Sequence, residues 1–166
     1  MLFCWRCQRQ TLVKVQVRYT MEKKPKNIFI QGPVLPNFIA ESIAHHSHKT
    51  GIGAHSIFLG QVRADVLPGG IVEAIDYSAY EELALEKAHQ IREEAFRLFP
   101  LHCLHIHHSL GRVAAGENSL FVFASSTHRK DAQEATAWLV DALKKELPVW
   151  GKEILTSGGH QWKQNT

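Results

Sequence analysis

Several short stretches of the chain alternate apolar and polar residues, and this pattern predicts β-strands. Residues 71–77 (IVEAIDY) alternate in the way typical of a half-buried strand, whereas residues 120–124 (LFVFA) are apolar throughout, as in a buried strand. Gly60 indicates a bulge or a close backbone approach within a strand, and Gly111 is expected to form the turn that ends another. The remaining strands are predicted at residues 27–31, 54–63, 101–110, 153–156 and 160–163.

Two longer segments repeat apolar residues at three- and four-residue spacing and predict amphipathic helices. The first spans residues 81–99, with a buried stripe formed by Leu83, Ala84, Ala88, Ile91, Ala95 and Leu98. The second begins after Ser126 or Thr127, either of which can cap it, and its apolar face contains Ala132, Ala135, Leu139, Val140 and Leu143. Pro148 is expected to end this helix near residues 146–147, because proline disfavours helix just before it.

A shorter helix, capped by Asn37, is predicted between the first two strands. This order of strands and helices favours an α+β fold, with helices packed on one face of a mixed sheet.

Length and composition limit the classes of protein to consider. The chain has 166 residues, enough for one domain, and its 45% hydrophobic and 21% charged content is ordinary for a globular protein. The net charge of +3 is too small to indicate nucleic-acid binding, but it fits an acidic partner or an anionic small molecule. No apolar run reaches the ~18 residues of a membrane span, and three cysteines make no disulfide framework, so we expect a cytoplasmic protein.

The first 20 residues differ from the rest of the chain. We interpret residues 1–20 as a disordered extension, or as sequence that precedes a true initiator at Met21, and residues 21–166 as a single domain. Cys4 and Cys7 form a CxxC motif, which indicates a metal or redox site only with a second ligand pair or a thioredoxin-like helix. The sequence contains neither.

Basic residues lie at both ends of the second long helix. His128 and Arg129 fall in its first turn, where free backbone amides bind anions, and we interpret them as a phosphate site rather than as a solvated pair. Lys144 and Lys145 fall in its last turn, where lysines also complement the helix dipole. His128 and Lys144 are separated by about 24 Å along a straight helix. Either they serve different sites, or two chains of a symmetric dimer form one site.

Four histidines, at positions 102, 105, 107 and 108, lie in one predicted strand. His105 and His107 share a face of that strand, which could bring two metal ligands together. No acidic residue or paired cysteine nearby in the sequence completes a tetrahedral set. The sequence therefore favours ordinary strand histidines and predicts no metal site.

Several motifs in order resemble the large, catalytic subunit of molybdopterin synthase. They are GQVRAD, YSAYEELA, FPLHCLHIHHSLGRVAAGE, SSTHRKDAQEA…LKKELPVWGKE and GHQWKQNT, and the resemblance runs from about Ile28 to the C-terminus. It implies an α/β hammerhead-type fold and a heterotetramer, in which two large subunits form a central dimer and a small ubiquitin-like carrier docks at each end. The carrier's Gly-Gly thiocarboxylate would deliver sulfur to cyclic pyranopterin monophosphate, in two rounds, to make the dithiolene of molybdopterin. No cofactor is implied for this step.

The resemblance also implies roles for particular residues. Its catalytic residues correspond to Lys144 and Lys152, with Lys144 as the candidate for proton transfer. Its substrate-binding residues correspond to Gln61, Val62, Arg63, His128, Arg129, Lys144, Gly151, Lys152 and Glu153.

Gly151 departs from the family pattern, because the family usually has a lysine directly after the tryptophan. Lys152 or Lys145 could supply the missing charge, although neighbouring residues on a strand point to opposite faces. Two alternatives stay open: a non-catalytic module of the same fold that binds an anion or the carrier, and a metal-binding protein that uses the histidine-rich segments and the CxxC motif.

Overall fold

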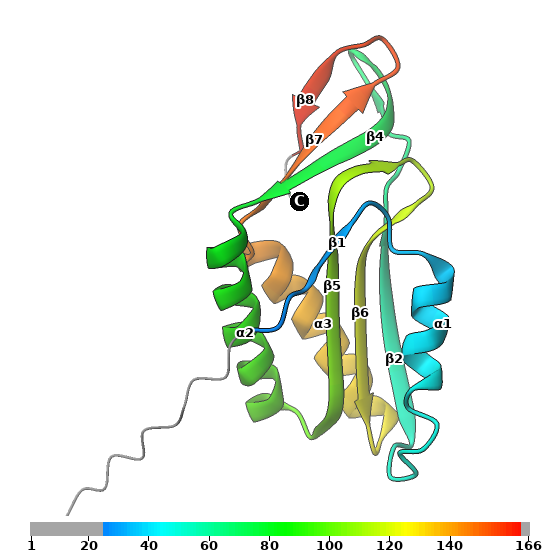
Figure 1. The fold of residues 1–166 in the computed structure, drawn as a ribbon, viewed down its shortest axis with the longest axis vertical. Coiled ribbons are helices and arrows are strands. Elements are labelled where there is room, and N and C mark those ends of the chain that lie inside the picture. Colours follow the sequence, from blue (N-terminus) through cyan, green and yellow to red (C-terminus); the bar gives the residue numbers. More distant parts are fainter. Residues whose placement is uncertain (1–24, 164–166) are drawn as a thin grey trace, which may run out of the picture.

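An eight-stranded, mostly antiparallel sheet and three helices make up the chain in this computed structural model, which describes residues 25–163 (Figure 1). The predictions for residues 1–20, including the CxxC motif, lie outside that range. The strands are β1 (Phe29–Gln31), β2 (Ala54–Gln61), β3 (Val66–Leu67), β4 (Gly70–Ala79), β5 (Leu101–Ala114), β6 (Asn118–Ser126), β7 (Val149–Leu155) and β8 (His160–Trp162). The helices are α1 (Pro36–Ala44), α2 (Glu81–Leu98) and α3 (Arg129–Glu146).

The strands follow the order β2-β6-β5-β4-β7-β8, and β1 pairs with β5 in the one parallel pairing found among the described residues. This arrangement confirms the predicted α+β class and the mixed sheet. A shift of register between Gly60 and Gln61 confirms the predicted bulge in β2.

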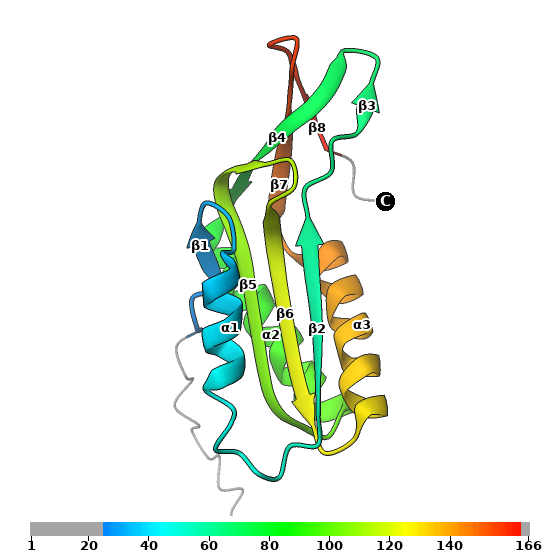
Figure 2. The same ribbon diagram turned by 90° about the vertical axis from the view of Figure 1, so that its right-hand side faces the viewer.

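The helices cover both faces of the sheet, so the prediction that they share one face is wrong. On one face, α2 and α3 pack against Leu120, Val122 and the main core (Figure 2). On the other face, α1 packs against Phe121 and Phe123, which alternate with the first pair along β6. All of residues 119–126 are buried, since both faces of this strand are covered.

Gly111 lies within β5, not at its end as predicted. Its φ of +74° is a conformation that glycine adopts without strain, and the strand changes partners there. Residues 101–108 pair with β6, whereas residues 111–114 pair with β4. This change of direction lets β4, β7 and β8 extend beyond the main part of the sheet (Figures 1 and 2).

The ends of the helices also differ from the predictions. Pro36 begins α1 in place of an Asn37 cap, and the N-cap position of α3 is His128 in place of Ser126 or Thr127. The Ser126 hydroxyl instead donates a hydrogen bond to the Pro100 carbonyl. The end of α3 at residue 146 is as predicted.

The apolar stripe of α2 is narrower than expected. Leu83 is 41% exposed and Leu98 is 45% exposed, while the other four predicted members are buried. None of the helices within residues 25–163 has an apolar run long enough to cross a membrane.

Candidate functional site

A cavity of about 360 Å³ lies where the C-terminal end of α3 meets the ends of β2 and β6 and the paired strands β4 and β7. Four of the predicted site residues line it: Gln61, Arg63, Lys144 and Gly151. They come from segments up to 90 residues apart in the sequence, and the sheet topology brings them together.

The lining of this cavity is cationic. Arg63, Lys144 and Lys163 contribute positive charge, and no Asp or Glu is among its described lining residues. The Arg63 guanidinium is 74% exposed and pairs with Asp65 at 2.9 Å, so it lies near the rim. A pocket with this balance of charge attracts an anionic ligand.

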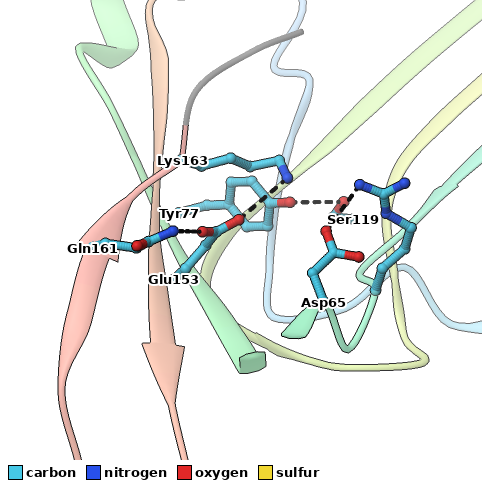
Figure 3. A network of polar contacts seen from close by, with 7 residues as sticks. Asp65, Tyr77, Ser119, Glu153, Gln161 and Lys163 are labelled. Atoms are coloured by element: carbon cyan, nitrogen blue, oxygen red, sulfur yellow. Dashed lines mark hydrogen bonds and ion pairs between the residues drawn. The ribbon is translucent and has the colours of Figure 1, made fainter. Parts of the chain in front are cut away.

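Lys163 is the functional candidate that the sequence analysis missed. Its backbone amide donates to the Gly151 carbonyl at 2.8 Å, so it lies directly beside the position where the family usually has lysine. Its Nζ is 3.4 Å from a Glu153 carboxylate oxygen, and the Gln161 side-chain amide donates to the other oxygen at 2.8 Å (Figure 3). The predicted strands at residues 153–156 and 160–163 do not reach Gly151, and only the observed register, which pairs Lys152 with Trp162, sets residue 163 opposite residue 151.

Gly151 is packed too tightly to hold a larger residue without adjustment. A Cβ atom there would lie 2.9 Å from Ile75 Cγ2 and 3.4 Å from Tyr77 Cε1. The glycine therefore lets the side chains of Ile75 and Tyr77 on β4 approach β7 closely. The positive charge at this place in the cavity comes from Lys163, which is paired with Gly151 across the strands.

Neutral polar groups complete the lining. Tyr77 donates to the Ser119 hydroxyl at 3.2 Å, and burial raises the pKa of Tyr77, so it stays protonated (Figure 3). His108 donates from Nδ1 to the Ser109 carbonyl at 2.8 Å, and burial lowers the pKa of this imidazole. The cavity thus combines cations with a neutral imidazole and a phenol.

Three of the predicted residues on or near β7 and β2 lie outside this lining. Lys152 is next to Gly151 on β7, on the opposite face of the strand, and is 3.9 Å from Asp76. Val62 is 2% exposed and belongs to a small apolar core with Val72 and Ile75 of β4. Glu153 does not line the cavity, but its carboxylate pairs with the ammonium of Lys163, which does.

His128 and Arg129 lie at the far end of α3 from Lys144, and both are exposed. The structure therefore brings Gln61, Arg63, Lys144 and Gly151 together, and leaves the predicted phosphate-binding pair outside the cavity of the same chain.

The strand order and the cationic cavity at the end of α3 define the class: an α+β protein with a positively charged cavity beside the lysine-bearing end of a helix. The family described as "MoaE protein" matches residues 36–146. The chain is 39% identical over 145 residues to the molybdopterin synthase catalytic subunit of Pyrococcus abyssi, covering 87% of this chain and 90% of that protein. It is 40% identical over 130 residues to molybdopterin synthase catalytic subunit 1 of Aedes aegypti, covering 76% and 81%.

Solved structures show the same fold. Molybdopterin synthase from Staphylococcus aureus superposes with a TM-score of 0.72 at 27% identity, covering 82% of this chain and 95% of that one. A chain in the complex of subunits 1 and 2 of molybdopterin-converting factor from Helicobacter pylori has the same fold, with a TM-score of 0.69 at 21% identity over 82% of this chain and 88% of that one. The chain therefore belongs to the MoaE family of molybdopterin synthase catalytic subunits. It is an enzyme of molybdenum cofactor biosynthesis.

Proposed function

We propose that the cationic cavity is where this chain converts cyclic pyranopterin monophosphate to molybdopterin, with sulfur from the C-terminal thiocarboxylate of a small carrier subunit. The observation that supports this proposal is the convergence of Arg63, Lys144 and Lys163 on one cavity that has no carboxylate among its described lining residues. Both reactants are anions, so they repel each other unless cations surround them.

The residues divide this work by their chemistry. Arg63 can donate two parallel hydrogen bonds to phosphate oxygens, and its exposure at the rim suits capture of the incoming substrate. Lys163 follows the end of β8, beside Gly151 of β7. Its ammonium is paired with Glu153 and supplies a compact positive charge. A carrier tail that ends in two glycines has no side chains to obstruct its entry into a cavity of about 360 Å³.

Lys144 is the group that we assign to proton transfer. The thiocarboxylate sulfur attacks a substrate carbon that is bonded to oxygen. A carbon–sulfur bond forms as that carbon–oxygen bond breaks, the displaced oxygen takes a proton, and the carrier is left attached as a thioester. Water then cleaves the bond between that sulfur and the carrier's acyl carbon, and the carrier departs as a carboxylate. An ammonium at the cavity can donate a proton as sulfur adds and stabilise the charge that develops during hydrolysis. A second round supplies the second sulfur.

The test compares Lys144→Ala with Lys145→Ala in single-turnover sulfur transfer from a thiocarboxylated carrier. Lys145 is the matched control, because it is in the same turn of α3 and does not line the cavity. We expect Lys144→Ala to slow transfer by about 10²- to 10⁴-fold and Lys145→Ala to have little effect. Near wild-type transfer by Lys144→Ala would end the catalytic assignment. Carrier binding without transfer by the wild-type chain would instead identify a binding module.

We also infer that a second copy of this chain supplies His128 and Arg129 to the cavity. On one chain these residues lie at the opposite end of an 18-residue helix, roughly 24 Å from Lys144. A symmetric dimer can place the start of one α3 near the end of the other.

Mixing two inactive variants tests this arrangement. If the cavity is shared, mixed dimers of Lys144→Ala and Arg129→Ala chains contain one site that is intact and one that lacks both groups. Random re-association should then restore about one quarter of the wild-type sites. If each chain forms its own site, mixing restores nothing.

A further inference from the structure

A second group of reactive side chains lies away from the cationic cavity, on the α1 face of the sheet. His46, Cys103 and His105 bring one ligand atom each within 4.8 Å of one another. Cys103 and His105 are two positions apart on β5 and share a face, while His46 follows the end of α1. The sequence could not show this group, because His46 is 57 positions before Cys103.

Two of the three separations between ligand atoms are close to those around a tetrahedral metal ion, and all three are within 4.8 Å. Cys103 Sγ is 3.2 Å from His105 Nε2, and His105 Nε2 is 3.4 Å from His46 Nε2. Zinc binds imidazole nitrogen at about 2.0–2.1 Å and thiolate at about 2.3 Å, so tetrahedral ligand atoms are about 3.3–3.6 Å apart. Small rotations of these side chains would therefore suffice to surround an ion.

The tautomer of His46 is fixed in the form that binds metal. Its Nδ1 is 2.7 Å from the Ser42 carbonyl, which can only accept, so Nδ1 carries the proton. Nε2 then has its lone pair directed toward His105 and Cys103. Histidines that bind a metal commonly donate their other ring N–H to a backbone carbonyl in this way, and the hydrogen bond orients the ring. His46 is only 4% exposed, so its ring is also held by packing.

The surroundings leave room for a fourth ligand. The Lys49 ammonium lies 3.7 Å from Cys103 Sγ. All three side chains line a cavity of about 700 Å³. Through it an ion can enter, and a water molecule can occupy the open position.

We propose that His46, Cys103 and His105 bind one divalent ion of the zinc class, with the fourth coordination position open to the cavity. Two imidazoles and one thiolate form a donor set suited to zinc, and softer than the oxygen sets that hold magnesium or calcium. The bound ion would tie the end of α1 to β5. This site is separate from the cationic cavity, since the two share none of their described lining residues, so it stands independently of the proposed function.

The experiment uses the full chain with Cys4→Ser and Cys7→Ser, which leaves Cys103 as the sole thiol of the three cysteines. After treatment with a chelator, Co²⁺ is titrated while absorption is followed, and Zn²⁺ is titrated by calorimetry. We expect one equivalent to bind, with a cobalt–thiolate charge-transfer band and the strong visible bands of tetrahedral cobalt. The melting temperature should rise with added Zn²⁺.

Ligand variants identify the site. Cys103→Ser should abolish the charge-transfer band, and His46→Gln or His105→Gln should weaken binding by about 10-fold or more. His160→Gln, on β8, is the matched histidine control and should bind like the parent. The measurement on the parent protein does not depend on whether a variant folds. If the parent shows no charge-transfer band at one equivalent of Co²⁺, the proposal is overturned. Unchanged bands in Cys103→Ser would overturn it as well.

Discussion

Lys163 and Glu153 form the interaction whose perturbation tests the site most sharply. The Lys163 side chain is 32% exposed and the Glu153 side chain is 8% exposed, so the carboxylate depends on its two partners for compensation of its charge. Replacing Lys163 by methionine keeps most of the length of the side chain and removes the ammonium. Of its two partners within residues 25–163, Glu153 then keeps Gln161.

The substitution should have two separate effects. Breaking a fully buried ion pair costs about 3–5 kcal/mol. Here the lysine is partly exposed and Gln161 still donates to Glu153, so we expect a smaller loss, about 1–3 kcal/mol of unfolding free energy. Loss of one charge-assisted contact to an anionic reactant should lower kcat/KM for sulfur transfer by roughly 10- to 100-fold.

Repeating the substitution in a Glu153→Gln background separates these effects. The neutral amide no longer needs the lysine, so Lys163→Met should cost little stability there. If Lys163 acts on the reactants, the substitution should still lower kcat/KM by a similar factor. Unfolding in urea and single-turnover transfer give the two readouts. The reasoning is refuted if Lys163→Met leaves transfer unchanged once Glu153 is neutral, because Lys163 would then act only as a counterion.

Further predictions concern packing, stability and pH. Gly151→Lys should destabilise the fold by about 1–3 kcal/mol and should not raise the transfer rate, because the new Cβ meets Ile75 at 2.9 Å; a large gain in rate would show that the chain lacks a useful cation. Leu139→Ala should lower the unfolding free energy by about 2–5 kcal/mol in urea titrations, since Leu139 is fully buried; a loss below 1 kcal/mol would contradict the packing described for α3. The lowered pKa of His108 means that the unfolded chain binds its proton more readily, so the stability that depends on this neutral ring is present above about pH 6.5 and is lost as pH falls below it. His108→Phe should therefore show a shallower decline of unfolding free energy below that pH, and an identical slope would contradict the assignment.

Much of the fold could be predicted because its signals are local. The alternation in β4, the continuous apolar run in β6 and the stripe of α3 gave the positions of these elements to within a few residues. Pro148 gave the end of α3, since its effect on the preceding backbone does not depend on the rest of the chain.

The wrong predictions involve tertiary context. Gly111 resembles a turn in the sequence, but its positive φ serves a change of partner within β5, which only the sheet topology determines. The position of α1 on the opposite face was likewise hidden, because Phe121 and Phe123 identify β6 as buried without identifying what covers them.

The predictions of site residues divide in the same way, between what the sequence indicates and what depends on tertiary structure. The resemblance selected Lys144 and Arg63, and both line the cavity, but it could not select Lys163, which takes its place through the pairing of β7 with the chain after β8. The resemblance also selected Lys152, which matches a lysine of the family motif, but the alternation of a strand directs it to the face opposite Gly151. Its catalytic role stays a prediction that its position does not support.

The kink at Gly111 gives β5 a mechanical role. One half of this strand is bonded to β6, which packs against α3 and so supports the wall that carries Lys144. The other half is bonded to β4, and through it to β7, the wall that carries Gly151. The placement of these two walls of the cationic cavity relative to each other therefore depends on the bend of a single strand, at a residue that does not line the cavity, so a substitution there could alter the width of the cavity without changing any lining group.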